Sequence, residues 1–268
     1  MAENSNAEIP VVILCGGQGT RIREVAERLP KPLVDIGGQP ILWHIMKLYS
    51  SFGFRRFILC LGYKSSDIKG YFLRYRETLS DFTVVLDEEH KPKYHNAIGD
   101  EDWEITCVET GLLTGTGGRI GRIERYIDTD TFMLTYGDGL GDVDIGELLS
   151  FHRHHGRIGT VTGVRPTSRF GELSVDGNVV TDFNEKPSAP SSFVSGGFFA
   201  FDRSFFKYLS TDENLFLESE PLRRLASDGE LGIRPHEGFW MGMDTFREYT
   251  QLNELWATGE APWKLWKD

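Results

Sequence analysis

The most constraining feature of the sequence is an apolar run that ends in a cluster of glycines near the N-terminus. Residues 11–15 read VVILC, and Gly16, Gly17 and Gly19 follow them. A short, β-branched apolar run bounded by glycines is typical of a strand that is buried on both faces of a parallel sheet. Ligands of open α/β sheets bind at the carboxyl ends of such strands. We therefore predict an α/β protein whose ligand site lies at this turn.

The residues of the turn predict a polyphosphate ligand. Glycines let the backbone approach a ligand closely and direct successive N–H groups toward phosphate oxygens. Arg21 and Lys31 add two positive charges nearby in the sequence. Two named phosphate motifs do not match, because the Gly-Lys-Ser/Thr of a Walker loop is missing and Ile22 stands where a dinucleotide fingerprint needs glycine. An ordinary glycine turn is the alternative interpretation of this stretch.

Composition limits the partners of the chain. Its 268 residues carry a formal net charge of -11, which argues against nucleic acid or an anionic membrane as the main partner. No apolar run is long enough for a transmembrane helix. Cys15, Cys60 and Cys107 are widely spaced in apolar segments, so we expect buried reduced thiols and a cytoplasmic protein. An acidic protein must bind a polyphosphate with a local basic pocket and a divalent cation.

Apolar segments alternate in a way that predicts a parallel sheet with helical crossovers. After the first strand, we expect buried strands at residues 57–63, 83–87, 105–108 and 132–136. Helical periodicity or helix-start signals occur at residues 41–49, 67–75, 120–126 and 144–155, and in a C-terminal helix that starts at Asp244. Residues 88–103 are polar and aperiodic, and we expect a long loop there.

Two further stretches bring polar groups to strand or helix ends. Thr116, Gly117 and Gly118 precede a predicted helix, and a glycine-rich helix start is a site for an anion or a polar ligand. Asp138 lies between two glycines at the end of a buried strand, where a carboxylate has room for Mg²⁺ and its waters. A turn residue is the alternative for Asp138, and a helix N-cap is the alternative for Asp244.

Beyond residue 156 the pattern changes to short strands. We expect them at residues 158–164, 172–175, 179–184 and 194–201, with a turn at 176–178, as in hairpins of an antiparallel sheet. This half of the chain is predicted to form a lid or a substrate lobe. We expect a disordered leader at residues 1–9 and one domain at 10–268, divided into a first half (10–156) that carries the glycine turns and a second half with the C-terminal helix (157–268).

Taken in order, the motifs resemble those of the sugar-1-phosphate nucleotidylyltransferases. The set comprises GGQGTR at 16–21, KP at 31–32, YGDG at 136–139, EKP at 185–187, GGFF at 196–199 and MDT at 243–245. Residues 41–46, 116–119, 238–240 and 261–264 more closely resemble the members of that family that make CDP-glucose. The resemblance extends from about residue 10 to residue 266.

The resemblance implies a fold and a reaction. The fold would be a Rossmann-like nucleotidyltransferase (GT-A-like) fold, with a mixed, mainly parallel central sheet flanked by helices and a smaller antiparallel sugar-binding lobe. A sugar 1-phosphate oxygen would attack the α-phosphate of CTP with the help of Mg²⁺, giving a CDP-sugar and pyrophosphate. Such a transfer needs alignment and charge neutralisation rather than a nucleophilic side chain. A homo-oligomer is implied by the resemblance alone.

The resemblance also assigns roles to individual residues. The catalytic set would be Arg21, Lys31, Asp138 and Lys186, and the Mg²⁺ ligands would be Asp138 and Asp244. Nucleotide contacts would come from Leu14, Gly16, Gly17, Gly19, Thr20, Arg21, Lys31, Thr116, Gly117, Gly118 and Asp138. Contacts to the sugar phosphate would come from Tyr136, Gly171, Glu185, Lys186, Ser195 and Gly196. Arg21 would hold the departing β- and γ-phosphates, and Lys31 would bridge the α-phosphate and the incoming phosphate.

Two positions depart from the glucose-specific pattern. That pattern has Asn-Gly-Gly-Phe-Phe where this chain has Ser195 before the two glycines, and it has Trp-Gln-Pro-Met-Asp where this chain has Met241 in place of the Gln. A serine hydroxyl reaches less far than an amide and makes fewer simultaneous hydrogen bonds. The sugar is therefore open between glucose 1-phosphate and a related hexose, heptose or cyclitol phosphate.

Other functions stay open at the level of the sequence. The same reaction with dTTP or UTP is one, because pyrimidine choice rests on a few backbone contacts. A catalytically silent paralogue that senses nucleotide sugars is another, although the joint presence of Arg21, Lys31, Asp138, Lys186 and Asp244 argues against it. A dinucleotide-dependent oxidoreductase lacks the third glycine and an acidic residue for a ribose.

Overall fold

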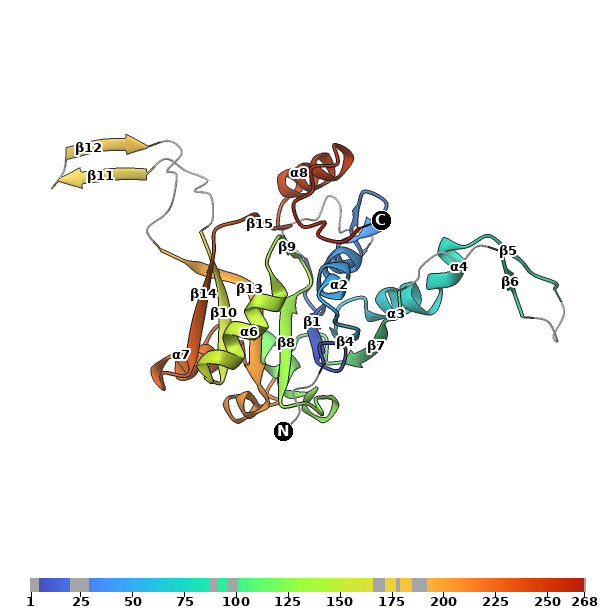
Figure 1. Cartoon of the computed structure of the whole chain (residues 1–268), viewed down its shortest axis with the longest axis horizontal. Coiled ribbons are helices and arrows are strands. Elements are labelled where there is room, and N and C mark those ends of the chain that lie inside the picture. Colours follow the sequence, from blue (N-terminus) through green and yellow to red (C-terminus); the bar gives the residue numbers. More distant parts are fainter. Residues whose placement is uncertain are drawn as a thin grey trace.

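A seven-stranded sheet forms the centre of the computed structural model, which describes residues 5–19, 29–86, 91–95, 101–165, 172–176, 179–184 and 192–267 (Figure 1). The strand order is β14-β10-β13-β8-β1-β4-β7. In chain order these strands are β1 (Pro10–Leu14), β4 (Arg56–Leu61), β7 (Glu104–Glu109), β8 (Thr131–Tyr136), β10 (Gly159–Val164), β13 (Val194–Asp202) and β14 (Leu231–His236). Only β13 runs against the others, so the sheet is mixed and mainly parallel, as predicted.

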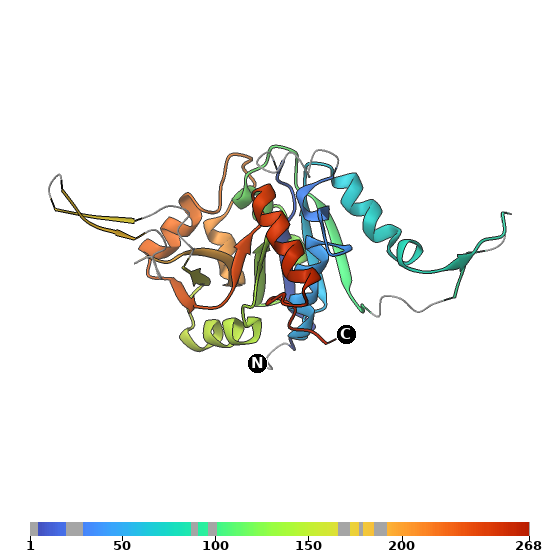
Figure 2. The same cartoon turned by 90° about the horizontal axis from the view of Figure 1, so that it is seen from above.

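Helices cover both faces of this sheet (Figures 1 and 2). The helices are α2 (Ile41–Ser51), α3 (Ser65–Leu73), α4 (Tyr75–Leu79), α5 (Thr116–Gly121), α6 (Ile145–His155), α7 (Glu220–Ser227) and α8 (Phe246–Ala257), with 3-10 turns η2 (Lys31–Leu33), η3 (Glu124–Tyr126) and η4 (Arg203–Tyr208). Alternate residues of β1 enter two separate cores: Val11 and Ile13 pack with α2 and α6, and Val12 and Leu14 pack with residues of α5 and η4. Burial of β1 on both faces explains its continuous apolar sequence.

The second half of the chain, which was predicted to form a lid or a substrate lobe, contributes two of its expected strands to the central sheet. Strands β10 and β13 join the central sheet, where β13 inserts between β8 and β10 and pairs antiparallel to both. Only β11 (Glu172–Asp176) and β12 (Val179–Asn184) form the expected hairpin, which projects from the sheet in both views (Figures 1 and 2). The antiparallel part is therefore smaller than the sequence suggested.

The prediction of a buried strand at residues 83–87 is wrong. The chain forms only a two-residue strand, β5 (Phe82–Thr83), which pairs with β6 (Lys93–Tyr94). Val84, Val85 and Leu86 are exposed, Leu86 by 94%. Helices α3 and α4 carry the chain away from the sheet, so this apolar run does not reach a sheet edge (Figure 2).

Residues 5–9, which the sequence assigned to a disordered leader, form a turn. The side-chain amide of Asn6 donates to the carbonyl of Phe52 at 2.9 Å, and Ile9 is buried.

Cys15 and Cys60 are buried, as expected, and Cys107 is half-buried. Burial raises the pKa of Cys60 to about 12, which keeps the thiol protonated. Across the described ranges, no helix combines the length and the apolarity needed to cross a membrane.

An aromatic cluster around His44 fastens α8 to the sheet domain. His44, on α2, is fully buried and makes edge contacts with Trp256 and Trp263. The indole N–H of Trp263 donates to His44 Nδ1 at 3.3 Å, and the other ring nitrogen lies 2.8 Å from the carbonyl of Ile36. Gly37 has φ +61°, and a Cβ there would lie 1.8 Å from the Trp256 ring, so only glycine fits.

Acid is expected to weaken the fold through this histidine. Burial lowers the pKa of His44 from 6.5 to about 4. Between these two pH values the unfolded chain binds a proton at this histidine and the folded chain does not. The contribution of His44 to the unfolding free energy is therefore complete above pH 6.5, and it falls by about 3 kcal/mol as the pH drops from 6.5 to 4. Urea unfolding across this range is expected to give a shallower fall for His44→Gln than for wild type. The exposed His154→Gln is the control, and equal slopes for all three proteins would contradict the assignment.

Candidate active site

The glycine turn after β1 lies at the carboxyl ends of the central parallel strands, as predicted. The carbonyl of Leu14 accepts from the N–H of Gly137 at 3.1 Å, and the N–H of Cys15 donates to Cys60 at 3.0 Å, so the turn is tied to β8 and β4. Gly19 has φ +61°, a conformation that favours glycine. Gly17 has open space around it. Thr20 and Arg21 lie outside the described residues.

Arg119 stabilises this turn through hydrogen bonds of its side chain, a role that the sequence did not predict. Its side chain is buried, with the residue 4% exposed, and its guanidinium donates to the ends of three strands. The acceptors are the carbonyls of Gly16 (3.1 Å), Leu61 (3.0 Å), Gly111 (2.7 Å) and Leu112 (3.3 Å) and the hydroxyl of Thr110 (2.8 Å). A Cβ on Gly16 would lie 2.2 Å from the guanidinium carbon. One signal was present in the sequence, namely a charged residue directly between Gly118 and the apolar Ile120.

Arg119→Lys is expected to destabilise the protein by about 3 kcal/mol, because a lysine cannot satisfy five acceptors that a planar fork satisfies. The substitution removes a buried donor from carbonyls that follow or end three strands, although those of Gly16 and Leu61 keep a backbone N–H, from Tyr63 and Thr110. Urea unfolding of the variant would measure the loss. Arg125→Lys is the matched control, since Arg125 packs on the Tyr126 ring. A loss no larger than that of the control would show that Arg119 does not organise the turn.

The second glycine cluster begins α5, as expected, but a neighbouring segment already engages it. The N–H of Gly118 donates to Leu215 at 3.0 Å. The hydroxyl of Thr116 accepts from the N–H of Leu217 at 2.8 Å and donates to Glu218 at 2.7 Å. These groups of Thr116 and Gly118 thus hold residues 215–218 against α5. The nucleotide contacts of Thr116, Gly117 and Gly118 stay a prediction.

Three charged side chains from distant parts of the sequence meet beside the first glycine turn. The ammonium of Lys31 lies 2.7 Å from Asp138 Oδ2 and 2.7 Å from Asp244 Oδ1. Lys31 is in η2, Asp138 follows β8, and Asp244 precedes α8. The Lys31 side chain is 11% exposed, whereas those of Asp138 and Asp244 are 39% and 42% exposed. The two carboxylates therefore face solvent around one buried cation.

A small antiparallel pair brings Asp244 to Asp138. Strand β9 (Gly139–Gly141) pairs with β15 (Trp240–Gly242), and the N–H of Met243 donates to the carbonyl of Asp138 at 2.8 Å. The N-cap alternative for Asp244 is wrong. Thr245 caps α8 in a reciprocal capping box with Glu248. The cap role therefore falls on the next residue and leaves the carboxylate of Asp244 to Lys31.

The electrostatics of this trio keep Lys31 charged. Burial alone would lower the pKa of Lys31, but the charges and hydrogen bonds of Asp138 and Asp244 outweigh burial and raise the pKa. Within the described part of the chain, no group of three or more His, Cys, Asp and Glu side chains converges. Two carboxylates that converge on one cation suit Mg²⁺, which typically takes one or two carboxylates together with substrate phosphates.

The predicted sugar side of the site is built around Tyr136. A Cβ on Gly197 would lie 2.6 Å from the Tyr136 ring, so the glycine backbone packs directly on it. The carbonyl of Gly196 accepts from the indole of Trp240 at 2.7 Å, and the exposed Ser195 accepts from the N–H of Gly197 at 3.3 Å. The remaining predicted contacts, Gly171, Glu185 and Lys186, lie outside the described residues.

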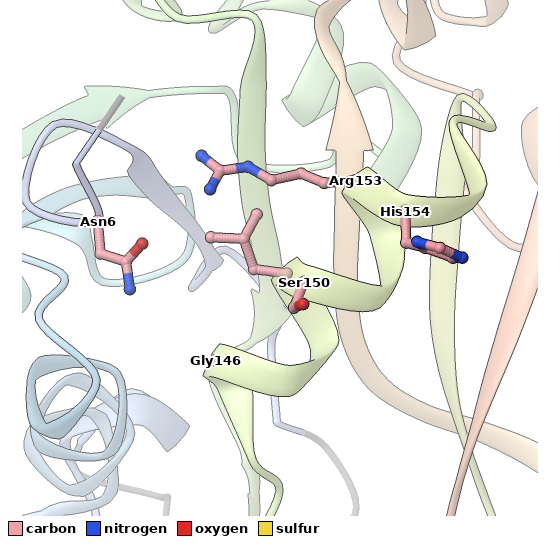
Figure 3. Close-up of a pocket in the computed structure, with 6 residues that line it drawn as sticks. Asn6, Gly146, Ser150, Arg153 and His154 are labelled. Atoms are coloured by element: carbon pink, nitrogen blue, oxygen red, sulfur yellow. The ribbon is translucent and has the colours of Figure 1, made fainter. Parts of the chain in front are cut away.

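A separate hollow of about 360 Å³ lies at the other end of β1 (Figure 3). It is lined by Asn6, Gly146, Leu149, Ser150, Arg153 and His154. Asn6 precedes β1 whereas the glycine turn follows it, so this hollow is not part of the candidate site. The guanidinium of Arg153 extends toward Asn6, whereas His154 points away (Figure 3).

The α/β fold places a lysine between two aspartates beside a glycine turn, an arrangement that suits a phosphate-bearing ligand and a cation. The chain belongs to the nucleotidyl transferase family, whose model matches residues 10–258. A probable glucose-1-phosphate cytidylyltransferase of Bacillus subtilis is 44% identical over 95% of this chain and 99% of its own length. The glucose-1-phosphate cytidylyltransferase of Salmonella typhi is also 44% identical, over 96% and 99%.

Solved structures support the fold. The crystal structure of HddC from Yersinia pseudotuberculosis covers 92% of this chain and 99% of its own, with a TM-score of 0.66 and 22% identity. At this identity the likeness concerns the fold alone. The family and the fold class that the motifs predicted are thus confirmed.

Proposed function

We propose that the protein transfers a cytidylyl group from CTP to a sugar 1-phosphate, glucose 1-phosphate or a related sugar, and releases pyrophosphate. The observation that carries this proposal is the convergence of Lys31, Asp138 and Asp244 beside the glycine turn. The names of the two bacterial relatives, each 44% identical over nearly the full chain, support the choice of CTP and of glucose 1-phosphate.

The residues would act by placement and charge. A phosphate oxygen of the sugar 1-phosphate attacks the α-phosphorus of CTP, and pyrophosphate leaves. Lys31, which is charged and buried, would neutralise negative charge on the α-phosphate, and Arg21 would hold the departing phosphates. The N–H groups of Gly16, Gly17 and Gly19 would hold the nucleotide.

Asp138 and Asp244 would hold a Mg²⁺ ion, which when bound neutralises charge on the triphosphate. Their fit to the ion rests on the two oxygens that already converge on one cationic nitrogen at 2.7 Å each. The ammonium of Lys31 occupies that position as a monovalent cation. Lys31 would therefore turn from the carboxylates toward phosphate when substrate is bound.

We propose that the two halves of the chain divide the substrates between them. Residues 10–156 would supply the nucleotide contacts, and residues 157–268 most of the sugar contacts, including Gly171, Glu185, Lys186, Ser195 and Gly196. The position of Ser195 beside Gly197 makes its hydroxyl a candidate for reading a sugar hydroxyl. A homo-oligomer stays a prediction from family resemblance.

Pyrophosphate release tests the proposal. CTP, dTTP, UTP, ATP and GTP are each crossed with a panel of sugar 1-phosphates, in Mg²⁺ and in excess chelator. We expect release with CTP and glucose 1-phosphate that stops with the chelator. Release with CTP and another sugar would retain the reaction and point to Ser195 and Met241 as the source of sugar choice. Silence with every pair would contradict the proposal and favour a nucleotide-sugar sensor.

A further inference from the structure

A segment between η4 and α7 carries a carboxylate into the candidate site. Residues 210–218 lie against α5, where the N–H of Gly115 donates to Glu213 at 2.7 Å. The contact is close, because a Cβ on Gly118 or Gly121 would lie 2.2 Å from a carbonyl oxygen of this segment. Glycines in α5 thus let the segment approach and fix the position of Glu218.

The carboxylate of Glu218 joins the two sides of the site. One oxygen accepts from the hydroxyl of Thr116 at 2.7 Å, and the other accepts from the hydroxyl of Tyr136. Thr116 begins α5 on the predicted nucleotide side, and Tyr136 ends β8 on the predicted sugar side. Neither oxygen of Glu218 is idle, although the residue is exposed.

Tyr136 is consequently held from two directions. The backbone of Gly197, with φ +79°, packs on its ring, and Glu218 accepts a hydrogen bond from its hydroxyl. Burial and then the charge of Glu218 raise the pKa of Tyr136, with a smaller contribution from the charge of Asp138. Tyr136 ends β8 two residues before Asp138, so it lies between the predicted cation ligand in the sequence and the backbone of Gly197 on its ring.

We infer that Glu218 is a positioning residue that sets the sugar 1-phosphate subsite by fixing Tyr136. This inference rests on the proposed function. Because the hydroxyl of Tyr136 donates to Glu218, its oxygen lone pairs are left to accept from a sugar hydroxyl. Loss of the carboxylate frees the hydroxyl of Tyr136 to rotate, whereas Thr116 keeps its bond from Leu217. The effect should therefore concern the sugar more than the nucleotide.

The test is a double-mutant cycle with Glu218→Ala and Tyr136→Phe, read as separate KM values for the sugar 1-phosphate and for CTP. We expect Glu218→Ala to raise the KM for the sugar 1-phosphate about tenfold, the scale of one hydrogen bond to a charged group, and to change the KM for CTP less than twofold. In the Tyr136→Phe background, Glu218→Ala should add no further rise. Glu218→Gln, which keeps one acceptor, should recover part of the loss.

Glu220→Gln is the matched control, because Glu220 lies two residues away and pairs with the exposed Arg224 on α7. An unchanged sugar KM in Glu218→Ala, an equal rise of both KM values, or full additivity with Tyr136→Phe would overturn the inference. If Glu218→Ala does not fold, the same cycle with Glu218→Gln decides between these outcomes. A wild-type protein without any turnover would instead refute the proposed function on which the inference rests.

Discussion

Lys31→Ala is expected to lower kcat about 10³-fold without unfolding the protein. The buried ammonium is the one described cation that touches both Asp138 and Asp244, and its charge is fixed by them. Loss of one positioned charge at a site of developing negative charge typically costs about two to three orders of magnitude. Steady-state pyrophosphate release under saturating substrates would measure kcat.

The same substitution is expected to tighten cation binding. In the wild-type protein, Lys31 lies 2.7 Å from one oxygen of each carboxylate, where it competes with a divalent ion. Without the ammonium, two carboxylates face each other with no counter-charge between them, and Mn²⁺ should bind about tenfold more tightly in calorimetry without nucleotide.

Lys69→Ala is the control for both measurements, since Lys69 forms an ion pair with Glu109 at the end of β7. A near-normal kcat in Lys31→Ala would show that Lys31 does not take part in the reaction. Weaker Mn²⁺ binding in Lys31→Ala would show that Asp138 and Asp244 do not form the cation site.

Asp138→Asn is expected to reduce turnover at least about 10³-fold at any Mg²⁺ concentration, because an amide replaces one of two anionic ligands with a neutral one. The fold should survive, since the carbonyl of Asp138 that accepts from Met243 is unchanged and Asp138 is 39% exposed at its side chain. Asp138→Asn is expected to lower both turnover and Mn²⁺ affinity, whereas Lys31→Ala is expected to lower turnover and to raise Mn²⁺ affinity.

Asp144→Asn is a matched control for this change. Asp144 is the N-cap of α6, where asparagine caps as well as aspartate, so activity and stability should both remain. If Asp138→Asn retained turnover within tenfold of the wild type, Asp138 would be a turn residue, which is the alternative that the sequence left open.

Local patterns in the sequence were enough to predict the parallel half of the fold. β1 and β8 are continuous apolar runs because both of their faces are buried, and the glycines that follow mark their carboxyl ends. The same reasoning correctly brought Asp138 to the edge of the sheet that holds the glycine turn. An apolar run alone does not show whether a sheet edge is within reach, which is why residues 83–87 were misjudged.

Contacts between distant segments were beyond such patterns. β13 could pair with neighbouring hairpin strands or enter the central sheet, and only the assembled chain selects its place between β8 and β10. Asp244 reaches Asp138 through the β9 and β15 pair, which joins strands about a hundred residues apart. The sequence placed these two aspartates together only through family resemblance. Arg119 and Glu218 act through backbone carbonyls and hydroxyls of other segments, and no local spacing announces such partners.

Isotope transfer tests the central claim most directly. The wild-type protein is incubated with Mg²⁺, CTP and glucose 1-phosphate that carries ¹⁸O at its three non-bridging phosphoryl oxygens, and the products are analysed by mass spectrometry. Attack by the sugar phosphate on the α-phosphorus predicts CDP-glucose that retains all three labelled oxygens and pyrophosphate that contains none. Label in pyrophosphate, or the absence of a labelled nucleotide sugar, would contradict the account.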